Sequence, residues 1–223
     1  HNKVIEVGPG KGALTKHLLK IKDILTLVEI DKECIFFLKN EFINENLEII
    51  EKDFLNFKIA ETYPSLRRIL IIGNFPYNIS SQILFKAIEN YNSISSLVGM
   101  FQKEVAERIC SEPGSKKYGI PSVIVQAFYD CEILFDVSND NFKPKPKVLS
   151  SVVRLRRNKK ELNCKFDDFL RVVKLSFSKR RKKIKNALKN FTKLSEVKDQ
   201  LILKKRAEEL SVNDYVMLTN KLL

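Results

Sequence analysis

The chain has few residues of the kinds that bind metals or form covalent cross-links. Its 223 residues include two histidines and four cysteines, and the cysteines (Cys34, Cys110, Cys131 and Cys164) are scattered without a Cys-x-x-Cys pair. We therefore expect neither a metal site nor a disulfide framework, and the composition fits a protein of a reducing cytoplasm. No apolar run approaches the roughly 18 residues that suggest a membrane span, and no signal peptide or internal repeat is visible.

Basic residues outnumber acidic residues, and most of the excess lies towards the C-terminus. The chain has 40 Lys and Arg against 27 Asp and Glu, a net charge of +13. Residues 158–223 contain 18 basic and 8 acidic residues and so contribute +10 of that charge. This distribution favours a basic module that docks on a phosphate backbone beside a nearly neutral domain. A generic solvated, lysine-rich surface would give the same balance.

Hydrophobic periodicity divides the chain into two parts. Strand-length apolar runs alternate with helix-like segments over the first part, which predicts parallel strands joined by helical crossovers. We expect strands at residues 4–7, 24–30, 47–50, 69–72, 94–101, 131–137 and 150–156, and helices at 13–19, 32–40, 103–111 and 121–129. After Arg157 the spacing is helical at 166–177, 182–188, 196–203 and 213–222. The prediction is an α/β fold, with a seven-stranded sheet ending in a late hairpin within 1–157, and a small all-helical domain at 158–223.

A glycine-rich turn follows the first expected strand. The segment Glu6–Gly12 reads Glu-Val-Gly-Pro-Gly-Lys-Gly, and such a turn lets the backbone approach a ligand at a helix N-terminus. A P-loop is excluded because Lys11 is followed by Gly12 instead of Ser or Thr. The dinucleotide fingerprint is excluded because the spacing is Gly-x-Gly-x-Gly. The segment instead resembles the first motif of Rossmann-like S-adenosylmethionine (SAM) methyltransferases.

Acidic residues end the next two expected strands. A carboxylate after the second strand can bind both ribose hydroxyls of a nucleoside, and Glu29 is the better candidate because Asp31 has the position of an N-cap for the following helix. After the third strand, Asp53 is placed to accept a hydrogen bond from an adenine amino group, with Phe54 beside the ring. Each acid alone would also fit a solvated charge or a cap. Their succession after three strands favours a nucleoside-like ligand.

The fourth expected strand ends in Gly73-Asn74-Phe75-Pro76-Tyr77. This turn brings together an amide oxygen (Asn74), a backbone carbonyl fixed by proline (Pro76) and a phenol ring (Tyr77). The two oxygens can accept both N–H bonds of an exocyclic amino group while the ring stacks on a flat base. An ordinary strand-end turn would also fit these four residues taken alone.

Together these segments resemble the ribosomal RNA adenine N6-dimethyltransferase family. The resemblance covers nearly the whole chain, and it is strongest towards the bacterial enzymes that act on the small subunit. It is weaker towards the macrolide-resistance enzymes of the large subunit and towards archaeal and eukaryotic relatives. The segments that carry it are Glu6–Gly12, Glu29, Asp53, Asn74–Tyr77, and residues 78–86, 101–109, 142–148 and 180–183.

The resemblance implies a fold, a cofactor and a set of site residues. The fold is a Rossmann-like, SAM-dependent methyltransferase domain, and the residues expected to bind SAM are Glu6, Gly8, Gly10, Glu29, Ile30, Asp53, Phe54 and Asn74. The residues expected to act on the base are Asn74, Pro76, Tyr77 and Phe142, the last as a second stacking ring that would otherwise be plain core packing. Hydrogen bonds to Asn74 and Pro76 would favour a pyramidal adenine N6 whose lone pair faces the SAM methyl group. No general base is required, which fits the shortage of histidine.

Members of this family usually carry a segment with a Gln-x-Phe-Leu-type motif before the first strand, which closes over SAM and the target base. The chain opens at His1, almost directly on the first strand, so these residues are expected to lack that part of the lid.

The implied substrate is small-subunit rRNA in the immature ribosomal subunit, dimethylated at two adjacent adenines near its 3′ end by a cytoplasmic, monomeric enzyme. We expect RNA contacts from Lys143, Lys145, Lys147, Lys179, Arg180, Arg181, Lys182, Lys183 and Lys185. The run 179–185 would also fit a solvated helix start, and some of its arginines a brace between domains. A large-subunit dimethyltransferase and a non-catalytic assembly factor remain alternatives. DNA adenine methylation is disfavoured, because such enzymes usually show Asp- or Asn-Pro-Pro-Tyr/Phe and a separate base-reading domain.

Overall fold

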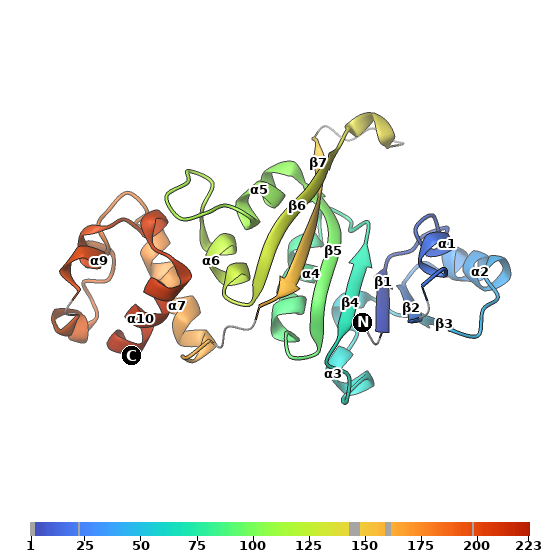
Figure 1. Cartoon of the computed structure of the whole chain (residues 1–223), viewed down its shortest axis with the longest axis horizontal. Helices are drawn as coiled ribbons and strands as arrows, with labels where there is room; N and C mark the ends of the chain where they lie inside the picture. The colour runs from blue at the N-terminus through green and yellow to red at the C-terminus, as the bar shows by residue number, and fades with distance from the viewer. Residues whose placement is uncertain (1–2, 22, 143–147, 159–161, 198) are drawn as a thin grey trace. The chain divides into compact units, whose positions relative to one another are not determined.

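The computed structural model describes residues 3–21, 23–142, 148–158, 162–197 and 199–223. Within these residues one sheet has seven strands in the order β3-β2-β1-β4-β5-β7-β6 (Figure 1). The strands are β1 (Lys3–Val7), β2 (Ile24–Glu29), β3 (Leu47–Glu51), β4 (Ile69–Gly73), β5 (Ile94–Gln102), β6 (Tyr129–Val137) and β7 (Ser150–Arg157). The predicted α/β fold with seven strands and a helical C-terminal part is confirmed.

The first five strands run parallel, and their register brings the candidate site residues to one edge. Glu6 of β1 lies opposite Leu27 of β2, and Gly73 at the end of β4 lies opposite Gly99 of β5. The pairing of β5 with β7 is antiparallel, with Gln102 of β5 opposite Ser150 of β7. Ligands of open α/β sheets bind at the carboxyl ends of parallel strands, which is where the glycine loop and the Asn74 turn both begin.

Helices α1 (Thr15–Leu18) and α2 (Lys32–Glu41) pack on the sheet through one apolar cluster. The buried residues of this cluster are Val4, Leu18, Leu25, Leu27 and Leu38. The start of α2 is fixed by Asp31, whose carboxylate accepts hydrogen bonds from the Glu33 and Cys34 backbone N–H groups at 2.8 and 3.1 Å. Asp31 is therefore the N-cap that the sequence predicts. The remaining elements near the sheet are η1 (Phe54–Asn56), α3 (Ile59–Thr62), α4 (Ser80–Glu89), α5 (Lys103–Ile109) and η2 (Asn139–Asn141).

The chain divides into two compact units, which we describe separately. The first contains His1–Ala106 and Glu132–Arg157, and the second contains Glu107–Cys131 and Asn158–Leu223. The second unit thus includes a segment from the middle of the chain besides the C-terminal part. Its elements are α6 (Ile120–Gln126), α7 (Phe166–Ser178), α8 (Ile184–Ala187), η3 (Thr192–Glu196), α9 (Gln200–Lys204), η4 (Ala207–Glu209) and α10 (Val212–Leu222).

The core of the second unit forms between α7 and α10. The rings of Phe177 and Tyr215 stack with centroids 6.2 Å apart, and Phe169 and Leu218 are fully buried. The Tyr215 hydroxyl donates to the Ala207 carbonyl at 2.8 Å, which satisfies a polar group that burial would otherwise penalise. An amphipathic stripe on α7 therefore buries against α10, as helical spacing in the sequence indicates.

Five predicted helices differ from the structure, and those predicted at 13–19 and 103–111 form shorter helices, Thr15–Leu18 and Lys103–Ile109. Residues 196–203 do not form one helix, because η3 ends at Glu196 and Asp199 caps a new helix by accepting from the Leu201 and Ile202 N–H groups at 3.0 and 3.2 Å. The helix predicted at 182–188 begins only at Ile184, since Lys183 pairs with Arg206 in an isolated bridge. The helix predicted at 121–129 ends at Gln126, before β6 begins.

None of the helices in the described parts of the chain combines the length and the apolar character that a membrane span requires.

Candidate active site

The glycine turn after β1 adopts a conformation that side chains disfavour. Gly8, Gly10 and Gly12 have φ angles of 63°, 56° and 77°. Two of them also have specific functions in the fold. A Cβ at Gly12 would overlap the Phe42 ring, and the Gly10 N–H donates to Glu29 Oε2 at 3.1 Å. The turn therefore presents backbone at the carboxyl edge of the sheet, as a ligand-binding loop requires.

The Glu29 carboxylate joins the end of β2 to this turn. Besides Gly10, it accepts from the Ile30 and Asp31 backbone N–H groups through Oε1, at 2.8 and 3.0 Å. The residue is 8% exposed, so its orientation is fixed by three hydrogen bonds. A carboxylate has about four acceptor positions, which leaves roughly one for a ligand hydroxyl.

Glu6 is the buried acid at the end of β1. It is 2% exposed, and its Oε2 accepts from Thr15 Oγ1 at 2.7 Å. Burial raises the pKa of Glu6 to about 7, with the Thr15 hydrogen bond opposing the rise and the negative charge of Glu29 adding to it. A positively charged ligand at this edge would stabilise the ionised form.

Asp53 and Phe54 lie at the end of β3, and both make contacts within the protein. Asp53 accepts from the Leu55 N–H at 2.8 Å and from Asn56 Nδ2 at 3.1 Å, so it is the N-cap of η1. Phe54 is 4% exposed, and Lys86 Nζ lies 5.7 Å from its ring centroid. The predicted contacts of Asp53 and Phe54 with an adenine ring stay predictions.

The turn after β4 is anchored by Phe75, a residue that the sequence does not single out. Phe75 is 1% exposed, and a Cβ at either Gly73 or Gly99 would overlap its ring. The ring also packs edge-on against Phe101, with centroids 5.7 Å apart. With Phe75 buried in the sheet, its neighbour Asn74 is exposed at the carboxyl edge.

The backbone of this turn leads directly into α4. The Pro76 carbonyl oxygen accepts from the Ile79 and Ser80 N–H groups at 3.1 and 3.0 Å. Among the described residues, none donates to the Phe75 carbonyl oxygen. The Tyr77 hydroxyl lies 2.5 Å from Ser150 Oγ. Asn74, Pro76 and Tyr77 thus sit on one short turn, and Phe75 offers a carbonyl that the structure leaves available.

Comparison with known proteins identifies the family. The model of the family described as ribosomal RNA adenine dimethylase matches residues 1–222. The chain belongs to this family.

Curated relatives of this dimethylase agree with the family match. The Ribosomal RNA small subunit methyltransferase A of Cytophaga hutchinsonii is 48% identical over 224 residues, covering 100% of this chain and 86% of the relative. The protein of the same name from Flavobacterium johnsoniae is 45% identical over 223 residues, covering 100% of this chain and 85% of the relative.

Two solved structures share the fold of this dimethylase. A dimethyladenosine transferase from Plasmodium falciparum superposes with a TM-score of 0.84 at 26% identity, over 98% of this chain and 88% of that one. The 23S rRNA methyltransferase ErmE superposes with a TM-score of 0.74 at 24% identity, over 99% and 90% of the two chains. The predicted Rossmann-like methyltransferase domain is thereby confirmed.

An apolar cavity of about 500 Å³ borders the Asn74 turn of the dimethylase. This volume lies within the range of small-molecule sites. The residues that line it come from α1 and the segment before it, and from four strands: Ala13, Leu14, His17, Ile72, Gly73, Asn74, Val98, Gly99, Met100, Leu134, Phe135 and Val152. Asn74 brings the amide group to a largely apolar lining.

Phe142 and the lysines after it are described only in part. Phe142 is half-buried at the end of η2, and its N–H donates to the Asn139 carbonyl at 3.3 Å. No contact between Phe142 and Tyr77 is present among the described residues, so the stacking pair stays a prediction. The other predicted residues of this segment, Lys143, Lys145 and Lys147, lie outside the described residues.

The basic run of the second unit contains residues of two kinds. Arg180 lies within the unit, with its Nε 2.5 Å from Glu208 and its Nη2 donating to the Lys116 carbonyl at 2.6 Å. It therefore connects the segment Glu107–Cys131 to η4. The remaining predicted residues are exposed: Lys179, Arg181, Lys182, Lys183 and Lys185.

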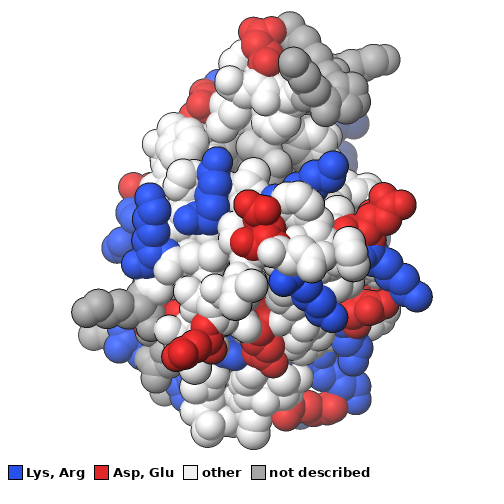
Figure 2. Space-filling view, turned by 90° about the vertical axis from the view of Figure 1, so that its right-hand side faces the viewer, with Lys and Arg blue, Asp and Glu red and all other residues white. Residues whose placement is uncertain are grey.

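Among its described residues, one face of the molecule shows no patch of charge of a single sign. In the face drawn in Figure 2, basic and acidic side chains are interspersed among uncharged ones.

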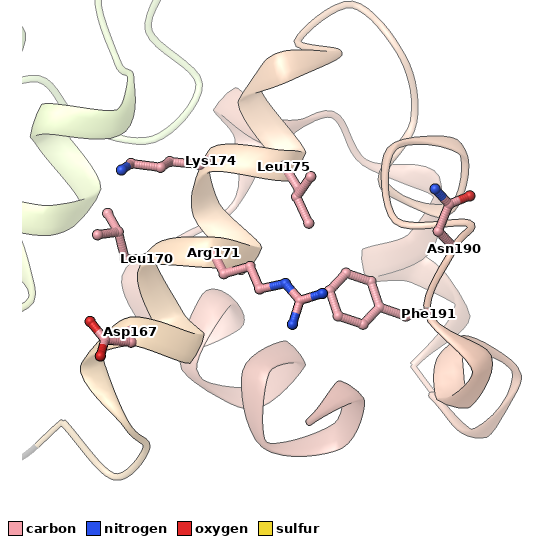
Figure 3. A pocket seen from close by; sticks show the side chains of 7 residues that line it. All are labelled: Asp167, Leu170, Arg171, Lys174, Leu175, Asn190 and Phe191. Carbon is pink, nitrogen blue, oxygen red and sulfur yellow. The ribbon is translucent and has the colours of Figure 1, made fainter.

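The second unit has a cavity that the sequence does not indicate. It measures about 530 Å³ beside α7 and is lined by Asp167, Leu170, Arg171, Lys174, Leu175, Asn190 and Phe191 (Figure 3). The Arg171 guanidinium points at Phe191 and lies 5.6 Å from its ring centroid. This pair closes one side of the cavity with a cation–π contact.

Proposed function

We propose that the chain is the SAM-dependent enzyme that dimethylates N6 of two adjacent adenines near the 3′ end of small-subunit rRNA during ribosome assembly. The observation that supports this most directly is the exposed Asn74 amide, held at the carboxyl edge of the sheet by the buried Phe75 ring. The curated relatives that are 48% and 45% identical carry the name small subunit methyltransferase.

The proposed SAM site is the edge formed by the glycine turn, Glu29 and Asp53. The positive φ angles of the turn let its backbone approach a ligand closely, and Glu29 keeps an acceptor position for a ribose hydroxyl. Asp53, although it caps η1, retains lone pairs that would accept from the adenine amino group of SAM. When bound, SAM supplies the electrophilic methyl group. Glu6, Ile30, Phe54 and Asn74 complete the proposed set.

The proposed base site is the turn at Asn74. The Asn74 side-chain oxygen would accept one N6–H of the target adenine. A backbone carbonyl would accept the other: Pro76, as predicted from the sequence, or Phe75, which the occupied lone pairs of Pro76 favour. Two such bonds pull the amino nitrogen out of conjugation and aim its lone pair. Tyr77 and Phe142 would stack on the base, which must leave its helix or already lie in a loop.

The proposed partner is the immature small subunit in the cytoplasm, with the enzyme acting as a monomer. The exposed basic residues of the run 179–185 would contact RNA phosphates, together with Lys143, Lys145 and Lys147. Two alternatives remain: a large-subunit dimethylase, and an assembly factor without turnover. The second unit and most of the positive charge serve RNA docking in each case.

The test is transfer of labelled methyl groups from SAM to small subunits purified from a strain that lacks this modification. Large subunits are the parallel substrate, and digested RNA is analysed for dimethyladenine. We expect label as N6,N6-dimethyladenine in the small subunit alone. Label in the large subunit would show that the substrate is large-subunit rRNA. SAM binding without methyl transfer to either subunit would support a non-catalytic assembly factor.

A further inference from the structure

Tyr77 is held at its hydroxyl by a residue far away in the sequence. Its oxygen lies 2.5 Å from Ser150 Oγ, across 73 positions of the chain. Ser150 is the first residue of β7, is fully buried, and pairs in register with Gln102 of β5. Packing holds the short Ser150 side chain in place, whereas the half-buried Tyr77 ring can rotate about two side-chain torsions unless a contact restrains it.

We propose that Ser150 is a positioning residue for methyl transfer, which holds the Tyr77 ring in the orientation that stacks on the target adenine. The inference rests on the proposed function, because it assigns Tyr77 the stacking role. The phenol oxygen lies on the long axis of the ring, so a hydrogen bond at that atom stops the ring from swinging about χ1. The first residue of β7 thereby controls a side chain that follows β4.

The consequence for catalysis is geometric. Methyl transfer needs the adenine nitrogen within about 3–3.5 Å of the methyl carbon and in line with the bond that breaks. A stacking ring free to swing would let the base leave that arrangement for part of the time. We expect the loss of this one hydrogen bond to lower kcat about tenfold, the size of one net hydrogen bond. KM for small subunits should stay unchanged, since many other contacts hold the RNA.

The variants needed are Ser150→Ala, Tyr77→Phe and the double variant, with Ser151→Ala as the matched control. Ser151 is the next residue of β7 and equally buried, but its hydroxyl donates to Asp136 Oδ1 at 2.6 Å instead. We expect Ser150→Ala and Tyr77→Phe each to lower kcat about tenfold and the double variant to lose no more than either, because both remove the same bond. Ser151→Ala should retain kcat within about twofold.

Three results would overturn the proposal: full kcat in Ser150→Ala, an equal loss in Ser151→Ala, or a further tenfold loss when Ser150→Ala is added to Tyr77→Phe. A readout without RNA separates this inference from the proposed function. In NMR spectra of protein with isotope-labelled tyrosine rings, the Tyr77 signals are assigned as those that vanish in Tyr77→Phe. They should shift in Ser150→Ala and not in Ser151→Ala, whether or not the wild type methylates small subunits. Tyr77 signals that do not shift in Ser150→Ala would refute the hydrogen bond between Tyr77 and Ser150.

Discussion

Replacing Glu6 by glutamine should remove a pH-dependent loss of stability that burial imposes on the protein. Glutamine has nearly the same shape and keeps an oxygen that can accept from the Thr15 hydroxyl, at 2.7 Å in the wild type. It carries no charge, so it avoids the cost of ionising a carboxyl group that is 2% exposed and near Glu29. The change therefore isolates the electrostatic cost of one acid.

The size of the effect follows from the pKa of Glu6, which burial raises from 4.5 to about 7 in the folded protein. Between these two values the folded state binds more protons at Glu6 than the unfolded state does. The free energy of unfolding must therefore fall as the pH rises through this window. A difference of about 2.5 pKa units corresponds to about 3 kcal/mol. This loss is complete above pH 7 and absent below about pH 4.5.

The assay is urea unfolding of the wild type and Glu6→Gln at several values between pH 4.5 and 8. The difference in the free energy of unfolding should move in favour of the glutamine variant by about 3 kcal/mol across the range. A difference that stays constant with pH would refute the reasoning, because it would mean that Glu6 titrates alike in both states.

Glu48→Gln is a control of opposite sign. Burial raises the pKa of Glu48, but hydrogen bonds from Lys3, Thr26 and Tyr63 outweigh it, and the pKa is lowered overall. Its contribution to stability is present above the unfolded pKa and is lost as the pH falls through the folded value. The difference between wild type and this variant should therefore shrink towards acid pH.

Three further perturbations test the site and the second unit. Asn74→Ala should leave SAM affinity, measured by calorimetry, largely intact, because the other proposed SAM-binding residues remain, yet reduce methyl transfer by at least about a hundredfold, the cost of a lost preorganised acceptor; normal transfer would exclude its proposed role. Gly99→Ala should lower the free energy of unfolding by about 1–3 kcal/mol, because the new methyl group overlaps the Phe75 ring; an unchanged urea midpoint would contradict that packing. Arg180→Ala should lower the melting temperature, because it removes the contacts with Glu208 and with the Lys116 carbonyl. Arg181→Ala should instead reduce the salt dependence of RNA binding by about one ion. The same result for both variants would show that the two arginines do not have separate roles.

Local patterns in the sequence predict local structure well in this chain. Asp31 caps α2 as expected, because a cap depends only on hydrogen bonds to residues two and three positions ahead. The strand ends at Glu29 and Gly73 fall within one residue of their predicted places, since apolar runs mark buried parallel strands. The cap is determined by contacts within three residues, and the strand ends are marked by apolar runs that the sequence shows directly.

Contacts between distant segments were not predictable from spacing. Nothing about Ser150 in the sequence indicates a bond to Tyr77, since the two meet only because β7 inserts beside β5. The assignment of Glu107–Cys131 to the second unit was not predictable either, because that segment continues the strand–helix pattern of the first unit.

One local feature was also missed. Asp199 interrupts the helix predicted at 196–203, because a strong N-cap competes with helix continuation.

The Asn74 turn depends on a glycine that lies outside it. Glycine within a strand costs stability, because it has no side chain to pack and more backbone freedom to lose, so Gly99 in the middle of β5 requires an explanation. The Phe75 ring occupies the space that a side chain at Gly99 would fill. A conventional strand residue there would displace Phe75, and the displacement would carry Asn74 with it. Gly99 in β5 and Phe75 after β4 therefore form one structural unit, which holds the proposed base acceptor at the edge of the sheet.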